Sequence, residues 1–168
     1  MFLKSVATPV GPILLCSLNG ITLDSVFFEQ TTEPWKNVIS WGAVFNEKKT
    51  AFVEASAWFE QYMRGEKPRP DQVELNPKGS EYQLRIWSIV QTIPYGETMT
   101  YKEIGEAYKK KYNVEYFSLR SVGAAIGKNP YAIIIPCHRV IGADGSLRGY
   151  AAGLKVKKAL LDFEKKTK

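Results

Sequence analysis

One short segment of the chain carries residue types suited to nucleophilic chemistry. Cys137 follows the apolar run 133–135 and Pro136, which indicates that stiff backbone holds the thiol. A thiol attacks as its thiolate, so a base or a cation must lower its pKa. His138, the single histidine, could relay that proton directly or through water, and Glu164 is a candidate to fix its tautomer. By spacing alone, however, a buried inert thiol is the favoured interpretation of a Cys–His pair.

The cysteine and histidine content argues against a metal site. The chain has two cysteines, Cys16 and Cys137, and neither a CxxC nor an HxxxH spacing occurs. Cys16 lies within an apolar strand-like run, which favours a small buried hydrophobic residue. We therefore expect no zinc, no other metal and no cofactor.

Length and composition indicate a globular protein of one or two domains. The chain has 168 residues, 45% of them hydrophobic. No run approaches the roughly 20 apolar residues of a membrane span, and the N-terminus does not resemble a secretory signal. We expect a cytoplasmic protein without membrane contact.

Positive charge is concentrated in the second half of the chain. Residues 1–77 hold 7 Lys/Arg against 9 Asp/Glu, whereas residues 78–168 hold 16 against 8. The net charge of +6 therefore arises entirely in the C-terminal half. Such a basic half suggests a polyanion as partner, although by charge alone a merely solvated surface is the favoured interpretation.

The first 76 residues predict a small α/β domain with antiparallel strands. Strand-like runs cover 5–18 and 21–28, and Asn19-Gly20 between them is a hairpin signal. Apolar residues at helical spacing then predict a helix within 47–63 that Gly65 ends. Pro68-Arg69-Pro70 is the best candidate linker.

Residues 77–168 predict a second, mostly helical domain, so the expected fold class is α+β. Helical spacing runs from Ser80 to about Ile93, from about Thr100, from about Ser118 and from about Gly153. The two short middle helices, joined by a turn, suggest a helix-turn-helix. Residues 133–135 are expected to form a short buried strand or extended segment.

The helix that begins near Ser118 has an unusual composition. With Leu119, Val122 and Ile126 in the core, Arg120 would be the one long side chain near the start of the opposite face. The remaining residues are small, so the helix could approach DNA closely in the minor or the major groove. Tight helix–helix packing explains the small residues equally well.

Several separated motifs resemble those of the O6-alkylguanine-DNA alkyltransferases. Residues 136–140 read PCHRV, the signature that surrounds the acceptor cysteine in that family. Other matching segments occur in the family's order over about 78–164: Ile93-Pro94-Tyr95-Gly96-Glu97-Thr98, Thr100-Tyr101, Arg120-Ser121-Val122-Gly123, Asn129-Pro130, Gly149-Tyr150 and 153–164. The N-terminal half is similar only in coarse type. The resemblance implies a small N-terminal α/β domain and a C-terminal domain with a winged-helix-like helix-turn-helix.

This resemblance implies irreversible, stoichiometric transfer of an alkyl group from O6 of guanine in double-stranded DNA, with O4 of thymine as a second candidate. Cys137 would accept the group, His138 would activate it through water, and Glu164 would orient His138. Asn129 would brace the turn before the cysteine. The protein would act as a monomer and be consumed by one reaction.

The resemblance also implies which residues bind DNA and the extruded base. Tyr101 would help to rotate the nucleotide and would hydrogen-bond N3, and Arg120 would fill the gap in the stack. Three further residues of the same helix would face DNA, and three later residues would contact the base: Ser121, Gly123 and Ala124, then Val140, Tyr150 and Ala151. Ser121 replaces a usual alanine and Ala151 a serine found in some members, which could change DNA affinity and the range of alkyl groups.

Three other functions fit parts of the pattern. A non-repairing alkyltransferase-like protein would bind alkylguanine, but such proteins lack the acceptor cysteine that Cys137 provides. A Cys–His hydrolase would turn over repeatedly and would need an oxyanion site that nothing in the sequence marks. A transcriptional regulator would be expected to carry long polar side chains on its recognition helix.

Overall fold

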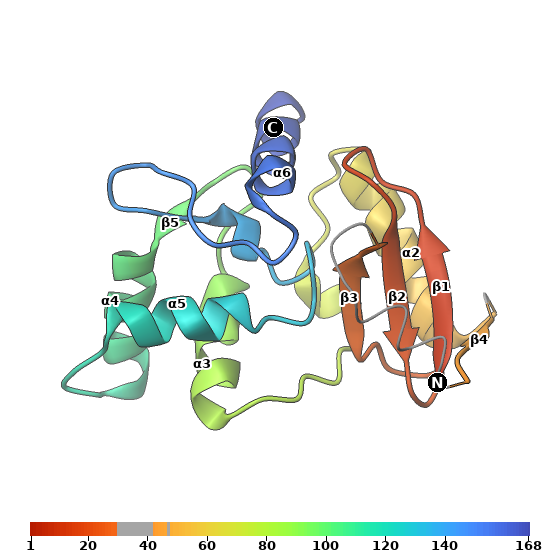
Figure 1. The fold of residues 1–168 in the computed structure, drawn as a ribbon, viewed down its shortest axis with the longest axis horizontal. Coiled ribbons are helices and arrows are strands. Elements are labelled where there is room, and N and C mark those ends of the chain that lie inside the picture. The colour runs from red at the N-terminus through yellow and green to blue at the C-terminus, as the bar shows by residue number, and fades with distance from the viewer. Residues whose placement is uncertain (30–41, 47) are drawn as a thin grey trace. The chain divides into compact units, whose positions relative to one another are not determined.

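The computed structural model describes residues 1–29, 42–46 and 48–168, and these form two compact units (Figure 1). The first unit holds residues 1–77 together with 130–132 and 167. The second holds 78–129, 133–166 and 168. A sheet dominates the first unit and helices dominate the second, so the predicted α+β class is confirmed. None of the described helices is both long and apolar enough to cross a bilayer.

Among the described residues of the first unit, a mixed sheet of four strands forms the core. Its strands are β1 (Phe2–Val6), β2 (Ile13–Ser17), β3 (Ser25–Phe28) and β4 (Val44–Phe45), in the order β3-β2-β1-β4. The first three pair antiparallel, as predicted, whereas β4 adds to β1 in parallel. Every residue of β2 is buried, including Cys16, which confirms the expected buried thiol. Burial raises the pKa of Cys16 to about 11, which makes it a poor nucleophile.

Helix α2 (Thr50–Met63) has the predicted apolar stripe. Its buried residues lie at helical spacing: Ala51, Phe52, Ala55, Trp58, Phe59 and Tyr62. Gly65, at φ +74°, follows the last turn as the sequence predicts, because a glycine adopts the left-handed conformation without steric cost.

Two local predictions in this unit were wrong. Asn19-Gly20 is no two-residue hairpin, because β3 begins at Ser25 and the connection spans residues 18–24. The Asn19 side-chain oxygen accepts from the backbone N–H groups of Ile21 and Thr22, which stabilises this longer loop. The expected linker 68–70 lies inside the unit, where the Trp58 indole donates to the Arg69 carbonyl at 2.8 Å.

Residues 130–132 join the first unit although they come late in the chain. Val26 pairs with Tyr131: Val26 N donates to the Pro130 carbonyl at 2.8 Å, and Ala132 N donates to the Val26 carbonyl at 2.9 Å. Tyr131 is fully buried, and its hydroxyl donates to the Leu23 carbonyl at 3.0 Å. Sequence periodicity gave no sign of this pairing, because it joins segments more than 100 residues apart.

The second unit is built on four helices, α3 (Glu81–Val90), α4 (Tyr101–Tyr112), α5 (Leu119–Gly127) and α6 (Leu154–Lys166). Side-chain caps from Ser80, Thr100 and Ser118 start the first three of these helices. Helix α3 packs on both α4 and α5, and the Trp87 indole donates to the Ala125 carbonyl at 2.8 Å. The pair α4 and α5, joined by residues 113–118, forms the predicted helix-turn-helix.

The segment that carries Cys137 differs from its prediction. Residues 132–134 form turns rather than a strand, and a short 3-10 helix, η3 (Cys137–Arg139), follows Pro136. Ile133 has φ +70°, a strained conformation for a β-branched residue that buried surroundings must enforce. After η3, strand β6 (Val140–Ile141) pairs in parallel with β5 (Met99–Thr100).

Candidate active site

Cys137 lies in a buried position and receives a hydrogen bond through its sulfur. It is 4% exposed, and its backbone N–H donates to the Ile135 carbonyl at 2.8 Å. The Asn129 side-chain amide donates to Cys137 Sγ at 3.0 Å and to the Ile135 carbonyl at 2.9 Å. Asn129 therefore closes the turn between the end of α5 and η3 and also aims a donor at the sulfur.

The thiol form of Cys137 is the stable one in the free protein. Burial raises the pKa of this thiol to about 12, although the Asn129 hydrogen bond and the charge of Lys157 lower it in part. A buried anion is costly, so the thiolate should form only as the reaction proceeds. A nearby base must then take the proton.

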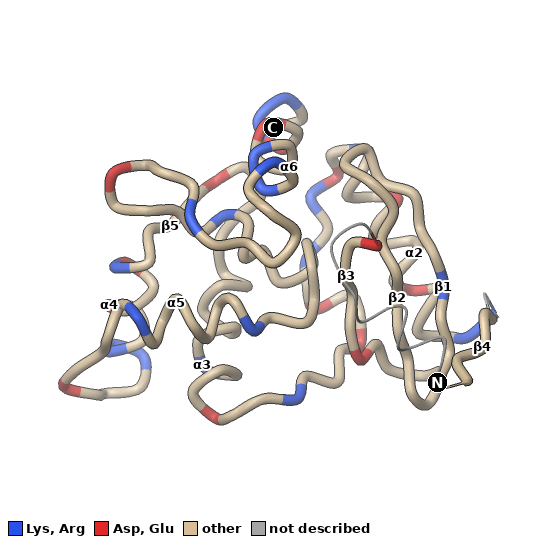
Figure 2. The backbone as a smooth tube through the Cα atoms, in the orientation of Figure 1, with Lys and Arg blue, Asp and Glu red and all other residues tan. Residues whose placement is uncertain are grey.

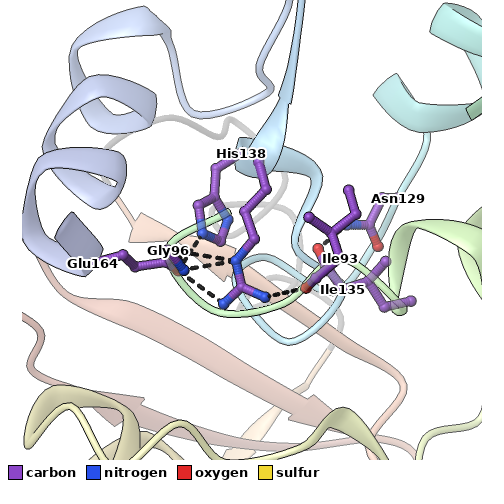
Figure 3. A network of polar contacts seen from close by, with 7 residues as sticks. Ile93, Gly96, Asn129, Ile135, His138 and Glu164 are labelled. Atoms are coloured by element: carbon purple, nitrogen blue, oxygen red, sulfur yellow. Dashed lines mark hydrogen bonds and ion pairs between the residues drawn. The ribbon is translucent and has the colours of Figure 1, made fainter. Parts of the chain in front are cut away.

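His138 is placed as such a base. Its Nε2 lies 2.7 Å from Glu164 Oε1, and both side chains are fully buried (Figure 3). Within the described chain, His138 Nδ1 has no hydrogen-bond partner. With the proton on Nε2 directed at Glu164, Nδ1 carries a free lone pair. Burial lowers the pKa of His138, more than Glu164 raises it, so the ring is neutral near pH 7.

Glu164 is held as a carboxylate by several donors. Arg139 donates to it through Nε and Nη2, at 2.9 Å for the shortest contact to each oxygen, and Gly96 N donates at 2.9 Å. Burial alone would raise the pKa of Glu164, but hydrogen bonds from His138 and Arg139 outweigh it and lower that pKa. The buried site thus holds an ionised acid that can stabilise a protonated His138.

Arg139 is a site residue that the sequence reasoning missed. In addition to its contacts with Glu164, its Nη1 donates to the Ile93 carbonyl at 2.7 Å. Its place beside His138 in the PCHRV segment was the available signal. The pairing with Glu164 becomes visible only when η3 and α6 are brought together.

Lys157 was also missed. It belongs to α6, is fully buried, and donates from Nζ to the Arg148 carbonyl at 2.7 Å. The Tyr101 hydroxyl donates to the same carbonyl at 3.0 Å. Burial lowers the pKa of Lys157 to about 8, and burial raises the pKa of Tyr101, so both groups remain donors near pH 7.

Helix α5 exposes the side chains that the sequence assigned to DNA. Arg120, Ser121 and Ala124 are exposed, and Gly123 is half-buried, with space for a Cβ 3.9 Å from the Tyr101 ring. Leu119, expected in the core, is 54% exposed, and Ala125 is buried with Val122 and Ile126 instead. Leu119 is the first residue of the helix, so its side chain precedes the core contacts of the later turns.

Basic residues occupy the ends of two helices of this unit. Lys109, Lys110 and Lys111 occupy the last turn of α4, and Lys165 and Lys166 the last turn of α6 (Figure 2). The predicted excess of positive charge in the C-terminal half is thus carried on helix surfaces, where it can meet phosphate groups.

The three residues expected near the base differ in exposure. Val140 is buried in β6, whereas Ala151 is exposed. The Tyr150 hydroxyl is buried without a hydrogen-bond partner among the described residues, and its ring stands edge-on to His138 with centroids 6.4 Å apart. Tyr150 thus lies beside the candidate base.

Over residues 1–29, 42–46 and 48–168, no group of three His, Cys, Asp or Glu side chains could hold a metal ion. The expectation of metal-free, cofactor-free chemistry stays a prediction. The groups present are those of proton transfer and nucleophilic attack.

Together these features define a helix-turn-helix protein with a buried cysteine beside a His–Glu pair. Comparison with known proteins assigns the family. Residues 81–166 match the family "6-O-methylguanine DNA methyltransferase, DNA binding domain". The chain is 42% identical over 164 residues to a methylated-DNA–protein-cysteine methyltransferase of Methanosarcina barkeri, with 98% of this chain and 97% of the relative covered. The chain therefore belongs to the methylated-DNA–protein-cysteine methyltransferase family.

Solved structures agree with this assignment. The crystal structure of the Mycobacterium tuberculosis O6-methylguanine methyltransferase matches with a TM-score of 0.81 at 37% identity, covering 99% of this chain and 94% of that one. The structure of Mycobacterium tuberculosis OGT in complex with DNA matches with a TM-score of 0.82 at 36% identity, with the same coverage. These similarities extend over both units, including the N-terminal half, for which the motifs were uninformative.

Proposed function

We propose that this protein repairs DNA by transferring a methyl or related alkyl group from O6 of guanine to its own Cys137. The observation that carries the proposal is the buried constellation around Cys137 in a member of this family: an amide donor on the sulfur and a neutral His138 backed by Glu164. An alkyltransferase-like protein has no acceptor cysteine, so it would not need this arrangement of an amide donor and a base.

The Cys137 sulfur attacks the alkyl carbon, the S–C bond forms, and the bond between that carbon and O6 breaks. The thiol proton passes to His138 Nδ1, directly or through water, and Glu164 stabilises the resulting imidazolium. Guanine leaves as an anion whose charge the Tyr101 hydroxyl stabilises by a hydrogen bond at N3, and it takes up the proton that His138 then releases to solvent. The product thioether is a poor leaving group, so each molecule reacts once.

DNA binding follows from the same unit. We propose that α5 enters the minor groove, because its exposed face is short-chained apart from Leu119 and Arg120, with Lys128 following at the C-cap. The alkylated base is extruded, Arg120 fills the gap, and Ser121, Gly123 and Ala124 line the contact. Backbone groups of Cys137, Val140 and Ala151, with Tyr150, are proposed to receive the base.

Other features of the proposal concern the chain as a whole. We propose that residues 77–168 form the reactive domain and that 1–76 form a supporting domain. We further propose that the protein acts as a monomer in the cytoplasm, without cofactor. Sedimentation with and without a lesion duplex would test the monomer.

The deciding experiment is intact-protein and peptide mass spectrometry after incubation with duplex DNA that carries one O6-methylguanine. The expected result is one methyl group on the Cys137 peptide and a yield limited to one per protein. Cys137→Ser should bind the duplex without transfer, and Cys16→Ser should react like the wild type. An unmodified wild-type protein that stays bound to the lesion would instead indicate a non-repairing relative.

A further inference from the structure

One backbone carbonyl in the second unit accepts two hydrogen bonds from groups of different kinds. The Arg148 carbonyl receives Lys157 Nζ at 2.7 Å and the Tyr101 hydroxyl at 3.0 Å. It belongs to the loop between β6 and α6, directly before Gly149 and Tyr150. The two donors come from α4 and α6, so this single oxygen ties the loop to both helices.

Burial of the Lys157 ammonium at this position costs free energy. A lysine in the first turn of an amphipathic helix would ordinarily extend into water, yet this one is fully buried, and burial lowers the pKa of its ammonium to about 8. The neighbouring Lys158 is exposed and pairs with Asp162. A buried ammonium is tolerated where its donors are used, and Lys157 uses one on the Arg148 carbonyl.

The Tyr101 hydroxyl has two alternative hydrogen-bond acceptors. In the free protein it donates to Arg148, whereas the proposed function requires it to donate to N3 of the extruded guanine. A hydroxyl has one proton to donate, so it must leave the Arg148 carbonyl when the base arrives. Without a second donor, that carbonyl would lose its partner at the moment when the loop has to hold the base.

We propose that Lys157 is a positioning residue that keeps the Arg148 carbonyl, and with it the loop 142–151, in place when Tyr101 turns to the base. This inference rests on the proposed function and deepens it. Because Lys157 also donates to the Arg148 carbonyl, Tyr101 can exchange this acceptor for N3 of the guanine at a low cost in free energy. Lys157 thus acts through Tyr101 and the loop, and its charge also lowers the pKa of the Cys137 thiol, an effect that does not depend on Tyr101.

If Lys157 served only to fill space, its substitutions would have different effects from those expected for a hydrogen-bond donor. If only its aliphatic stem were needed, Lys157→Met would preserve the site because methionine retains an unbranched apolar chain. If the donor is needed, Lys157→Met removes it while filling nearly the same space. Lys157→Arg restores a cationic donor, and Lys158→Met is the matched control for loss of one positive charge on the same helix.

The first readout does not depend on alkyl transfer. The Arg148–Gly149 bond is a trypsin site whose carbonyl is the oxygen in question. We expect Lys157→Met to raise the initial rate of cleavage after Arg148 several-fold, with Lys158→Met equal to the wild type and Lys157→Arg between them. Circular-dichroism melts establish that each variant is folded under the assay conditions. Unchanged cleavage in a folded Lys157→Met protein would overturn the proposal.

The second readout is the single-turnover rate of transfer from a duplex with one O6-methylguanine. Loss of a charged donor should slow Lys157→Met by about 10- to 100-fold. In a Tyr101→Phe background, where no partner exchange occurs, the same substitution should cost less than about threefold. Equal losses in both backgrounds would contradict the exchange of partners. If the wild type transfers nothing while the cleavage difference persists, the proposed function fails and the role of Lys157 in the loop stands.

Discussion

Two regions of the second unit are built in opposite ways. Around Cys137, polar side chains are hydrogen-bonded: the half-buried Asn129 to the sulfur, and the buried Glu164 to His138 and Arg139. On the outer face of α5, Arg120 and Ser121 are exposed. The buried region fixes atoms before the reaction, whereas the exposed face leaves its side chains free to adapt to DNA.

This difference indicates where substitutions will matter for different reasons. In the buried region, removal of one partner leaves another charge or donor unsatisfied, so stability and reactivity should fall together. On the exposed face of α5, substitutions should leave stability almost unchanged and affect only reactions that require duplex DNA. Each of the following experiments tests one side of this contrast.

The largest expected effect is that of Glu164→Gln. The substitution leaves the buried Arg139 without its carboxylate, which should cost about 3–5 kcal/mol of unfolding free energy and abolish transfer. Urea denaturation and mass spectrometry measure the two losses, and the exposed Asp162→Asn serves as control. Because folding lowers the pKa of Glu164, its contribution is present above its unfolded pKa of about 4.3 and is lost as the pH falls below it. A Glu164→Gln protein as stable as the wild type would contradict the expectation that substitutions in the buried region lower stability and reactivity together.

The next effect concerns the pH dependence of Cys137 reactivity without DNA. A thiol with its pKa raised to about 12 should react with iodoacetamide at a rate that rises about tenfold per pH unit, and thus about 100-fold between pH 7 and 9. Peptide mass spectrometry in a Cys16→Ser background isolates the Cys137 signal. A plateau below pH 9 would mean that the thiolate is already stabilised in the free protein.

Arg120→Ala should separate duplex repair from the chemical step. We expect about a tenfold or greater loss of transfer from duplex DNA and an unchanged rate with a free O6-alkylguanine base, because only the duplex requires extrusion. Lys128→Ala, also exposed at the end of α5, removes a charge at a different position and should cost less. Equal losses on duplex and free base would eliminate Arg120 as an extrusion device.

The smallest effects compare two apolar residues of α5. Val122 is fully buried, so Val122→Ala should lower the unfolding free energy by about 1–3 kcal/mol. Leu119→Ala, at a position 54% exposed, should stay within about 0.5 kcal/mol. Thermal or urea melts measure both. A large loss at Leu119 would show that the start of α5 is packed more tightly than its exposure indicates.

Much of the fold was predictable because its signals are local. Helical spacing of apolar residues predicted α2, α3, α4, α5 and α6, and caps such as Ser80 and Ser118 marked their starts. Predictions failed where distant contacts override local preference. The segment 133–135 has strand-forming residues yet forms turns, and Asn19 stabilises a loop rather than a tight hairpin.

The candidate site also combines features that are local in the sequence with features that depend on distant contacts. Sequence by itself determined which segment is the candidate for nucleophilic attack, since Cys137 and His138 are neighbours and their motif is contiguous. It also determined the order of the motifs that match the family and the positive charge of the C-terminal half. These properties depend on residue type and spacing, which the chain carries without folding.

Tertiary structure alone decided which groups meet. It brought Glu164 onto His138 and Arg139, set the Asn129 amide on the Cys137 sulfur, buried Lys157 against the Arg148 carbonyl and left Leu119 exposed. Hydrogen bonds between distant segments and the burial that shifts a pKa exist only when the chain is packed. Residue type and spacing thus singled out Cys137 as the candidate nucleophile, and packing determined its environment.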